Sequence, residues 1–167
     1  ASAIGGLPGA QSDAVDDYLE VANAWNNAEV FDQTQKAFFQ VHRTGPAVAG
    51  TKRWFTAQLA GGTPWGWYQS GGILNFRYRD NVPATITVAA PALVVNSNYI
   101  IALRHDGSSV KGYITSLTPN FTRADGFQST ETTADDAHFE DGTEGTMGEF
   151  IAYRGPITDA DVALVMN

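Results

Sequence analysis

The chain has 167 residues, a formal net charge of −8 and no cysteine. This length suits one domain with its own hydrophobic core. Because the chain has no cysteine, no disulfide can stabilise that domain. The acidic balance argues against a nucleic-acid partner, because phosphate needs a basic surface, and no apolar run approaches the ~20 residues needed for membrane insertion.

Short alternating runs separated by turn residues predict strands along most of the chain. Before them, the glycine-rich residues 1–12 are expected to be a flexible N-terminal arm, followed by a single domain at 13–167. The predicted strands are residues 17–22, 36–43, 53–59, 64–69, 73–79, 84–89, 98–105, 109–116 and 148–154. Residues 121–146 are polar and acidic, so we expect mostly loop there, with at most one weak strand.

The chain ends with a helix signal. Thr158 is a good N-cap, and Asp161 three residues later is an acidic variant of the capping box. Residues 158–165 are therefore predicted to form a short helix, with Val162, Leu164 and Val165 packed against the body. Together the elements predict an all-β fold, a two-sheet antiparallel jelly-roll sandwich with a short C-terminal helix.

Three segments carry a family resemblance. "SDAVDDYLEVAN" (12–23), "NSNYIIALRHDGSSVKGYITS" (96–116) and "MGEFIAYRGPITDADVALV" (147–165) follow one another in the order of the family's opening, central and closing strands. The chain resembles the concanavalin A-like lectin/glucanase superfamily, in particular its laminin-G-like jelly rolls. It departs from that pattern at Asn98-Tyr99, where the family has Trp-His, and at Ser116-Leu117, where the family has Asn-Gly.

The resemblance implies two kinds of acidic site. Glucanases of this superfamily carry catalytic carboxylates in an E-x-D-x-x-E strand, and the acidic segment here lacks that spacing, so we predict no catalytic residues and no enzyme activity. Many relatives bind Ca²⁺ through carboxylates at the sheet rim. The candidate ligands here are Asp135, Asp136, Glu140 and Asp141. The alternative is a solvated acidic loop.

A ligand-binding face is predicted on the hairpin at 64–79. Sugars bind by stacking on aromatic rings beside amide or guanidinium groups. The candidate ligand-binding residues are Trp65, Trp67, Asn75, Arg77 and Arg79. The alternative is that either tryptophan belongs to the core and that the arginines pair with acids.

These observations favour a non-catalytic jelly-roll module displayed on a surface. The main hypothesis is a virion-associated protein, such as a phage capsid decoration or tail adhesion protein that contacts protein neighbours in an assembly. The alternative is a secreted, lectin-like carbohydrate-binding module that recognises cell-surface glycans, and a glycoside hydrolase is third. The expected location is accordingly a virion surface or the extracellular space.

Overall fold

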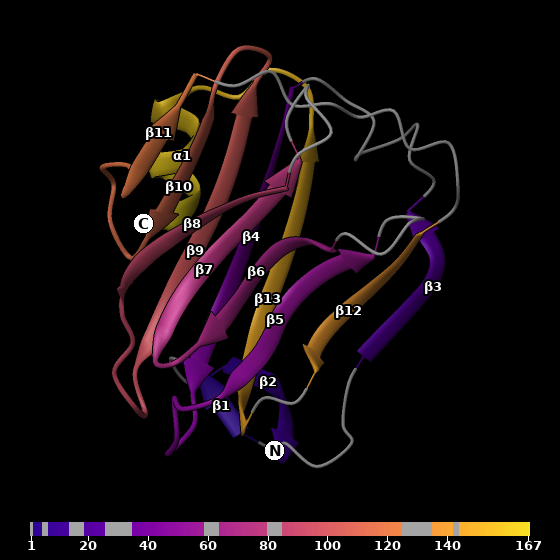
Figure 1. Ribbon diagram of the computed structural model, residues 1–167, viewed down its shortest axis with the longest axis vertical. Coiled ribbons are helices and arrows are strands. Elements are labelled where there is room, and N and C mark those ends of the chain that lie inside the picture. The colour runs from indigo at the N-terminus through magenta and orange to yellow at the C-terminus, as the bar shows by residue number, and fades with distance from the viewer. Residues whose placement is uncertain are drawn as a thin grey trace.

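The computed structural model describes residues 2–4, 7–13, 19–25, 35–58, 64–79, 85–124, 135–141 and 144–167. These residues form two antiparallel sheets and one helix (Figure 1). The seven-stranded sheet has, in spatial order, β1 (Ser2–Ile4), β2 (Leu7–Asp13), β13 (Glu144–Arg154), β4 (Gln35–Thr44), β9 (Asn98–Asp106), β10 (Val110–Ile114) and β11 (Phe121–Arg123). The six-stranded sheet has β3 (Leu19–Trp25), β12 (Asp135–Asp141), β5 (Thr51–Gln58), β6 (Pro64–Ser70), β7 (Ile73–Arg79) and β8 (Thr85–Ala92).

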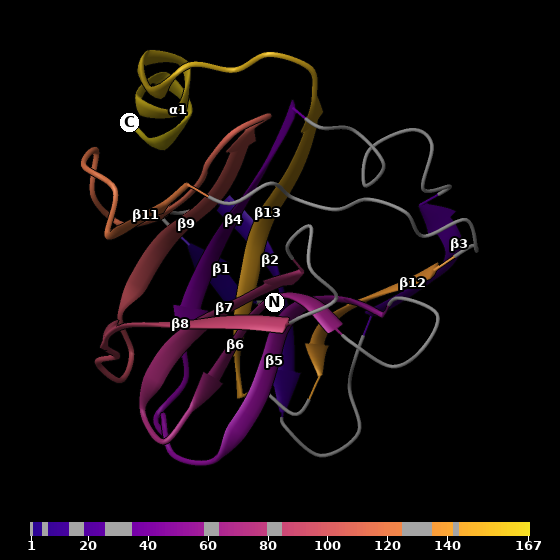
Figure 2. The ribbon, with the colours of Figure 1, turned by 45° about the horizontal axis from the view of Figure 1, so that its top comes forward.

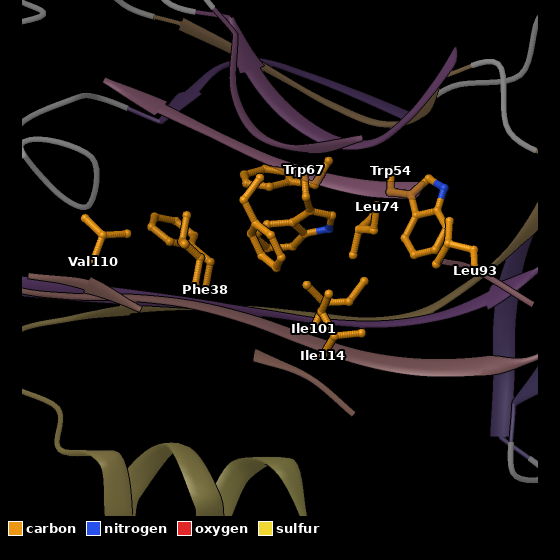
Figure 3. Close-up of a cluster of buried hydrophobic side chains, with 11 residues drawn as sticks. Phe38, Trp54, Trp67, Leu74, Leu93, Ile101, Val110 and Ile114 are labelled. Atoms are coloured by element: carbon orange, nitrogen blue, oxygen red, sulfur yellow. The ribbon is translucent and has the colours of Figure 1, made fainter. Parts of the chain in front are cut away.

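The hydrophobic core lies between the two sheets, as Figure 3 shows. On the inner faces of β4, β7 and β9, alternate residues such as Phe38, Phe76 and Ile101 are fully buried. Rings dominate the contact, and the Phe55 ring centroid lies 4.5 Å from Phe150 and 5.0 Å from Trp67. The fold class predicted from alternation, a two-sheet antiparallel sandwich with a short C-terminal helix, is confirmed.

Polar groups inside this core are hydrogen-bonded to one another. The Gln40 side chain donates to the Trp54 carbonyl at 3.2 Å and accepts the indole N–H of Trp67. The indole N–H of Trp54 in turn donates to Gln69 Oε1 at 3.3 Å, and the Trp54 ring stacks on His42 with centroids 3.7 Å apart. Because a buried indole N–H without a partner is costly, these contacts allow both tryptophans to be buried completely.

The strand predictions hold best in the middle of the chain. The expected strand at 73–79 coincides with β7, and those at 36–43 and 98–105 lie within β4 and β9. The face assignment on β7 is also confirmed for Leu74 and Phe76, which are both 0% exposed. The side chains of Tyr78 and Arg79 lie outside the described residues.

Two segments differ from expectation. Within the predicted arm, residues 7–12 belong to β2, which pairs with β13, and residues 2–4 form β1. Within the predicted acidic loop, residues 135–141 form β12, which pairs with β3 on one side and β5 on the other. Both sequences have weak strand propensity, and in each case pairing with a neighbouring strand outweighs that preference.

The C-terminal helix α1 (Asp159–Met166) covers part of the outer face of the seven-stranded sheet (Figure 2). Thr158 is its N-cap, and both hydrogen bonds of the predicted capping box are present. The predicted packing residues need correction, because Val162 and Met166 are buried whereas Leu164 is 76% exposed. Among the described residues, no helix is long and apolar enough to cross a membrane.

A charged cluster fixes α1 on the sheet. Arg104 donates to the Ile157 carbonyl at 2.5 Å and to Asp159 at 2.7 Å, and Asp159 also accepts from Lys111 at 2.5 Å and Tyr113 at 2.9 Å. The hydrogen bond from Lys111 lowers the pKa of Asp159, with Tyr113 and Arg104 adding to the effect. Burial, together with Asp159, raises the pKa of Tyr113. The first turn of the helix is therefore held by a carboxylate that stays ionised.

Candidate functional site

The outer face of β5, β6 and β7 carries a compact set of polar side chains. The strand register places Arg53 of β5 opposite Tyr68 of β6, and Tyr68 opposite Asn75 of β7. Ala89 of β8 completes the row, and its exposed methyl group leaves Asn75 open on that side. Directly opposed residues on one sheet face have Cβ atoms about 5 Å apart, so this row presents neighbouring groups to solvent.

Arg77 lies in the next row of the same face. Phe76 points into the core, so its neighbour Arg77 points outward, on the same side as Asn75. The Nε atom of Arg77 is buried and has no hydrogen-bond partner. Three ion pairs seen among the described residues are Arg104 with Asp106, Arg104 with Asp159, and Lys111 with Asp159. None of these involves Arg77. Among the described residues, this guanidinium therefore has no acceptor for its Nε–H and no ion-pair partner.

A glycine leaves space beside this arginine. Gly66 of β6 pairs directly with Arg77 and has φ +137, a conformation that residues with side chains rarely adopt. A Cβ atom there would lie 2.2 Å from the Phe55 carbonyl oxygen, so the backbone itself requires glycine. The Arg77 side chain consequently has no side-chain neighbour at the directly opposed position of β6.

The charge of this face contrasts with that of the whole protein. Arg53 of β5 and Arg77 of β7 lie on this face, and β5, β6 and β7 contain no acidic residue. The acidic strand β12 borders β5 and places Asp141 opposite Arg53. The chain as a whole has 18 acidic and 10 basic residues. The positive charge of Arg77, two strands away from β5 and three from its acidic neighbour β12, favours an anionic ligand at this part of the face.

Asn75 adds a hydrogen-bonding group to the site. Its amide nitrogen donates to the Ile73 carbonyl at 3.1 Å, which fixes the orientation of the side chain. In the part of the chain that the structure describes, no group donates to its amide oxygen. The half-buried Tyr68 ring lies opposite Asn75 and offers an aromatic surface. Guanidinium, amide and aromatic groups thus converge within two rows of the sheet.

The predicted ligand residues separate into three groups. Asn75 and Arg77 share the outer face. Trp67 is 0% exposed and packs in the core, as in the alternative in which a tryptophan of this hairpin is a core residue. Its ring is therefore not accessible to a sugar. Trp65 lies on β6 and Arg79 on β7, but their side chains are outside the described residues. Their contribution to ligand binding stays a prediction.

Two members of this face were not among the predicted site residues. Tyr68 was visible in the sequence beside the tryptophans, and its cross-strand position opposite Asn75 is the signal that identifies it. Arg53 could not be placed by alternation, because the register of β5 shifts between Arg53 and Phe55. Trp54 and Phe55 are consequently both fully buried although they are adjacent.

The acidic residues proposed as calcium ligands lie on β12 and not in a loop. Asp135, Asp136, Glu140 and Asp141 belong to this strand, and the register places Asp141 opposite Arg53 of β5. Their side chains are outside the described residues. Elsewhere in the described part of the chain, no group of three or more His, Cys, Asp or Glu side chains is arranged to hold a metal ion.

Comparison with known proteins places the fold. No family model and no curated protein matches the chain. The CBM40 module of the Ruminococcus gnavus IT-sialidase has a TM-score of 0.70 at 15% identity, covering 95% of this chain and 96% of that chain. The chain shares its fold. The binding domain of botulinum neurotoxin serotype D has a TM-score of 0.69 at 9% identity, with 90% of this chain and 40% of that chain covered.

An enzyme is also similar. The Trypanosoma rangeli sialidase has a TM-score of 0.60 at 11% identity, and the match covers 79% of this chain but only 22% of that chain. At such low identities these likenesses establish a common β-sandwich architecture, and function has to be argued from the site.

Proposed function

We propose that the protein is a non-catalytic carbohydrate-binding module of the concanavalin A-like, laminin-G-like type. It binds acidic glycans through the outer face of β5, β6 and β7. The observation that carries the proposal is the guanidinium of Arg77, whose buried Nε has no partner within the protein. Because the charged guanidinium has no ion-pair partner among the described residues, a ligand carboxylate would supply a charge-assisted hydrogen bond to it.

The ligands of the similar proteins support a glycan. CBM40 of the R. gnavus sialidase has been seen with α2,3- and α2,6-sialyllactose, with TM-scores of 0.68 for both complexes. Botulinum neurotoxin type C, with a TM-score of 0.64, depends on interaction with two ganglioside molecules for cell entry. These neighbours favour the carbohydrate-binding alternative over the virion-associated hypothesis, which none of them supports. An extracellular location follows from the same proposal.

A non-catalytic role also fits the chemistry of the face. Glycoside hydrolysis ordinarily needs two carboxyl groups about 5–10 Å apart across the scissile bond. The described strands of this face, β5, β6, β7 and β8, contain no Asp or Glu. The proposed site therefore has groups that hold an anionic sugar and none that would cleave it by the usual carboxylate pair.

Isothermal titration calorimetry with α2,3-sialyllactose and lactose tests the proposal. We expect the wild-type protein to bind sialyllactose and to bind lactose much more weakly, because only the former carries a carboxylate. Arg77→Ala should reduce the affinity for sialyllactose tenfold or more, since a charge-assisted hydrogen bond contributes about 1.5–3 kcal/mol.

The matched control is Arg154→Ala, which removes an exposed arginine from β13 of the other sheet. It should leave the affinity unchanged, which separates a local contact from a general effect of net charge. Equal affinities of the wild type and Arg77→Ala would contradict the assignment of this face. Equal binding of lactose and sialyllactose would contradict the acidic-glycan proposal.

Calcium binding by Asp135, Asp136, Glu140 and Asp141 is a separate proposal based on the family resemblance. Binding of a metal ion to the folded state alone stabilises it by about 2.7 kcal/mol at a hundredfold excess over Kd. We therefore expect a higher midpoint of thermal unfolding in calcium chloride than in EDTA, and Asp136→Asn combined with Glu140→Gln should remove the difference. Identical midpoints in the two buffers for the wild type would contradict the proposal.

A further inference from the structure

The outer face of the seven-stranded sheet is divided into a covered part and an uncovered part. Helix α1 packs over β9, β10 and one end of β4, where Ala37, Ala102 and Tyr113 contact Val162 and Met166. Strand β13 lies on the other side of β4, outside this contact (Figure 2). The helix therefore stands beside an area of sheet that no described helix or strand covers, and the surface has a step at the edge of the helix.

An apolar groove follows this step. It is shallow, with a volume of about 30 Å³ between the sheet and the helix. Its lining comes from β4, β9, β13 and α1 and consists of Phe39, Gln40, Val41, Ile100, Glu149, Ile151 and Val165. Ile151 is 37% and Val165 44% exposed, so apolar surface extends from the groove onto the open face. Contiguous apolar surface on a soluble protein typically marks an interaction site.

The same face carries a protruding apolar side chain. Val162 and Met166 are buried one turn apart, which places Leu164 on the opposite side of the helix, facing away from the sheet. Leu164 is 76% exposed, the largest value among the exposed large hydrophobic residues of the described chain. A projecting leucine and an apolar groove thus occur side by side on one surface.

Opposite charges flank the groove. Arg43 is an exposed residue of β4, and Glu149 is an exposed residue of β13 that lines the groove. Glu149 pairs with Val41, so it is diagonal to Arg43 on the sheet, and no ion pair joins the two within the described residues. Both charges remain available to a partner.

We propose that a second copy of this chain occupies the face in a two-fold symmetric dimer. A two-fold interface uses the same patch on both subunits, so the patch must contain both members of every complementary pair. This face meets that requirement twice, with Leu164 and its groove and with Arg43 and Glu149. Each α1 lies on the part of the other subunit's sheet that no described helix or strand covers, Leu164 packs over the shallow groove of the partner subunit, and Arg43 faces Glu149 of the partner subunit.

The dimer has a consequence for ligand binding. The face of β5, β6 and β7 lies on the opposite side of the sandwich, so two subunits joined through the seven-stranded sheets expose both ligand faces outward. Two linked sites can raise the avidity for a glycan-covered surface by about a hundredfold or more. This consequence rests on the proposed function, whereas the dimer itself does not.

Sedimentation equilibrium of the wild type and two variants tests the dimer. The wild type should show twice the chain mass of 17.9 kDa, with a concentration-dependent monomer fraction. Leu164→Glu should be monomeric, because it places a charge in the apolar contact. The matched control Ile73→Glu changes a side chain that is 38% exposed on β7 of the other sheet, and it should remain dimeric.

Charge exchange gives a second, independent readout. Arg43→Glu and Glu149→Arg should each weaken the dimer, and the double variant should restore it. Circular dichroism confirms that each variant is folded. A wild type that stays monomeric up to about 100 µM would overturn the proposal, since it excludes any dimer with a Kd below that order. A dimer that persists in Leu164→Glu would overturn it as well.

Discussion

The two outer faces of this sandwich differ in how far their outward side chains are buried. On the six-stranded sheet, Arg77, Asn75 and Tyr68 are half-buried, and small residues such as Gly66 and Ala89 lie beside them. On the seven-stranded sheet, outward residues of β4 and β9 such as Phe39 and Ala102 are buried beneath α1. The same strand alternation thus produces a polar face on one sheet and a second small core on the other.

This difference shows that strand alternation determines only which side chains point away from the central core. It assigns Arg77 and Phe39 equally to an outer face. A neighbouring element then determines whether such a residue is exposed, and here that element is a helix of eight residues at the end of the chain. No described helix or strand covers the face that we propose as the ligand site, and this contrast can be tested by substitutions on each side.

The largest expected effect separates two neighbouring residues of β7. Phe76→Ala should lower the free energy of unfolding by about 3–5 kcal/mol, because Phe76 is fully buried against Trp67 and the change leaves a cavity. Arg77→Ala should change it by no more than about 0.5 kcal/mol, because an outward side chain without an ion pair contributes little to folding. Urea unfolding measures both. The reverse ranking would show that the register of β7 is shifted by one residue.

The sequence predicted elements whose own pattern is strong. Strand β7 alternates strictly, and the N-cap at Thr158 defines the start of α1 to within one residue. The pair of strands β9 and β10 is joined by a short turn in which Ser108 and Ser109 donate to Asp106. Burial alone would raise the pKa of Asp106, but these hydrogen bonds lower it well below the usual range. Local chemistry of this kind is readable in a single sequence.

Other features depend on long-range pairing and could not be read. Strand β12 is an acidic segment that becomes a strand because β3 and β5 flank it. The bulge in β5 buries Trp54 and Phe55 together and moves Arg53 to the ligand face, which strict alternation does not allow. In the candidate site, the residue types in the sequence were enough to propose Asn75 and Arg77 as ligand-binding residues. The unpaired Nε of Arg77 and the gap at Gly66 required coordinates.

A smaller effect is expected at Asp159, whose hydrogen bonds hold helix α1 on the seven-stranded sheet. Asp159→Asn should lower the free energy of unfolding by about 1–2 kcal/mol at pH 7, a value reduced from that of buried charged hydrogen bonds because 49% of the side chain is exposed. Tyr113→Phe, which removes only one of the hydrogen bonds to Asp159, should cost less. Urea unfolding at a series of pH values measures both variants.

The pH dependence identifies the cause of that effect. The folded-state pKa of Asp159 is lowered from 3.8, so its stabilisation is complete above about pH 4 and is lost as the pH falls through the folded-state value. The difference between the wild type and Asp159→Asn should therefore shrink in acid. A difference that stays constant from pH 7 down to about pH 2 would show that the carboxylate charge is not responsible.

The smallest effect concerns the beginning of α1, the element that makes the two outer faces different. The Thr158 hydroxyl accepts from the Asp161 amide at 3.2 Å, and the Thr158 amide donates to the Asp161 carboxylate at 2.7 Å. Thr158→Ala removes the first of these bonds and should lower the free energy of unfolding by about 1 kcal/mol. Thr158→Ser keeps the hydroxyl and should cost only a few tenths of that amount.

Hydrogen exchange then shows where the loss of the cap acts. The amide of Val162, which donates to the Thr158 carbonyl at 3.0 Å, should exchange faster in Thr158→Ala, whereas the amides of β7 should be unaffected by local opening. This pattern follows because loss of a cap frays the first turn of a helix without unfolding the sheet beneath it. Equal acceleration in α1 and β7 would mean that the helix opens only with the whole sandwich. In that case the coverage of this face would be part of the global fold, and the two outer faces would differ in sequence alone and not in local stability.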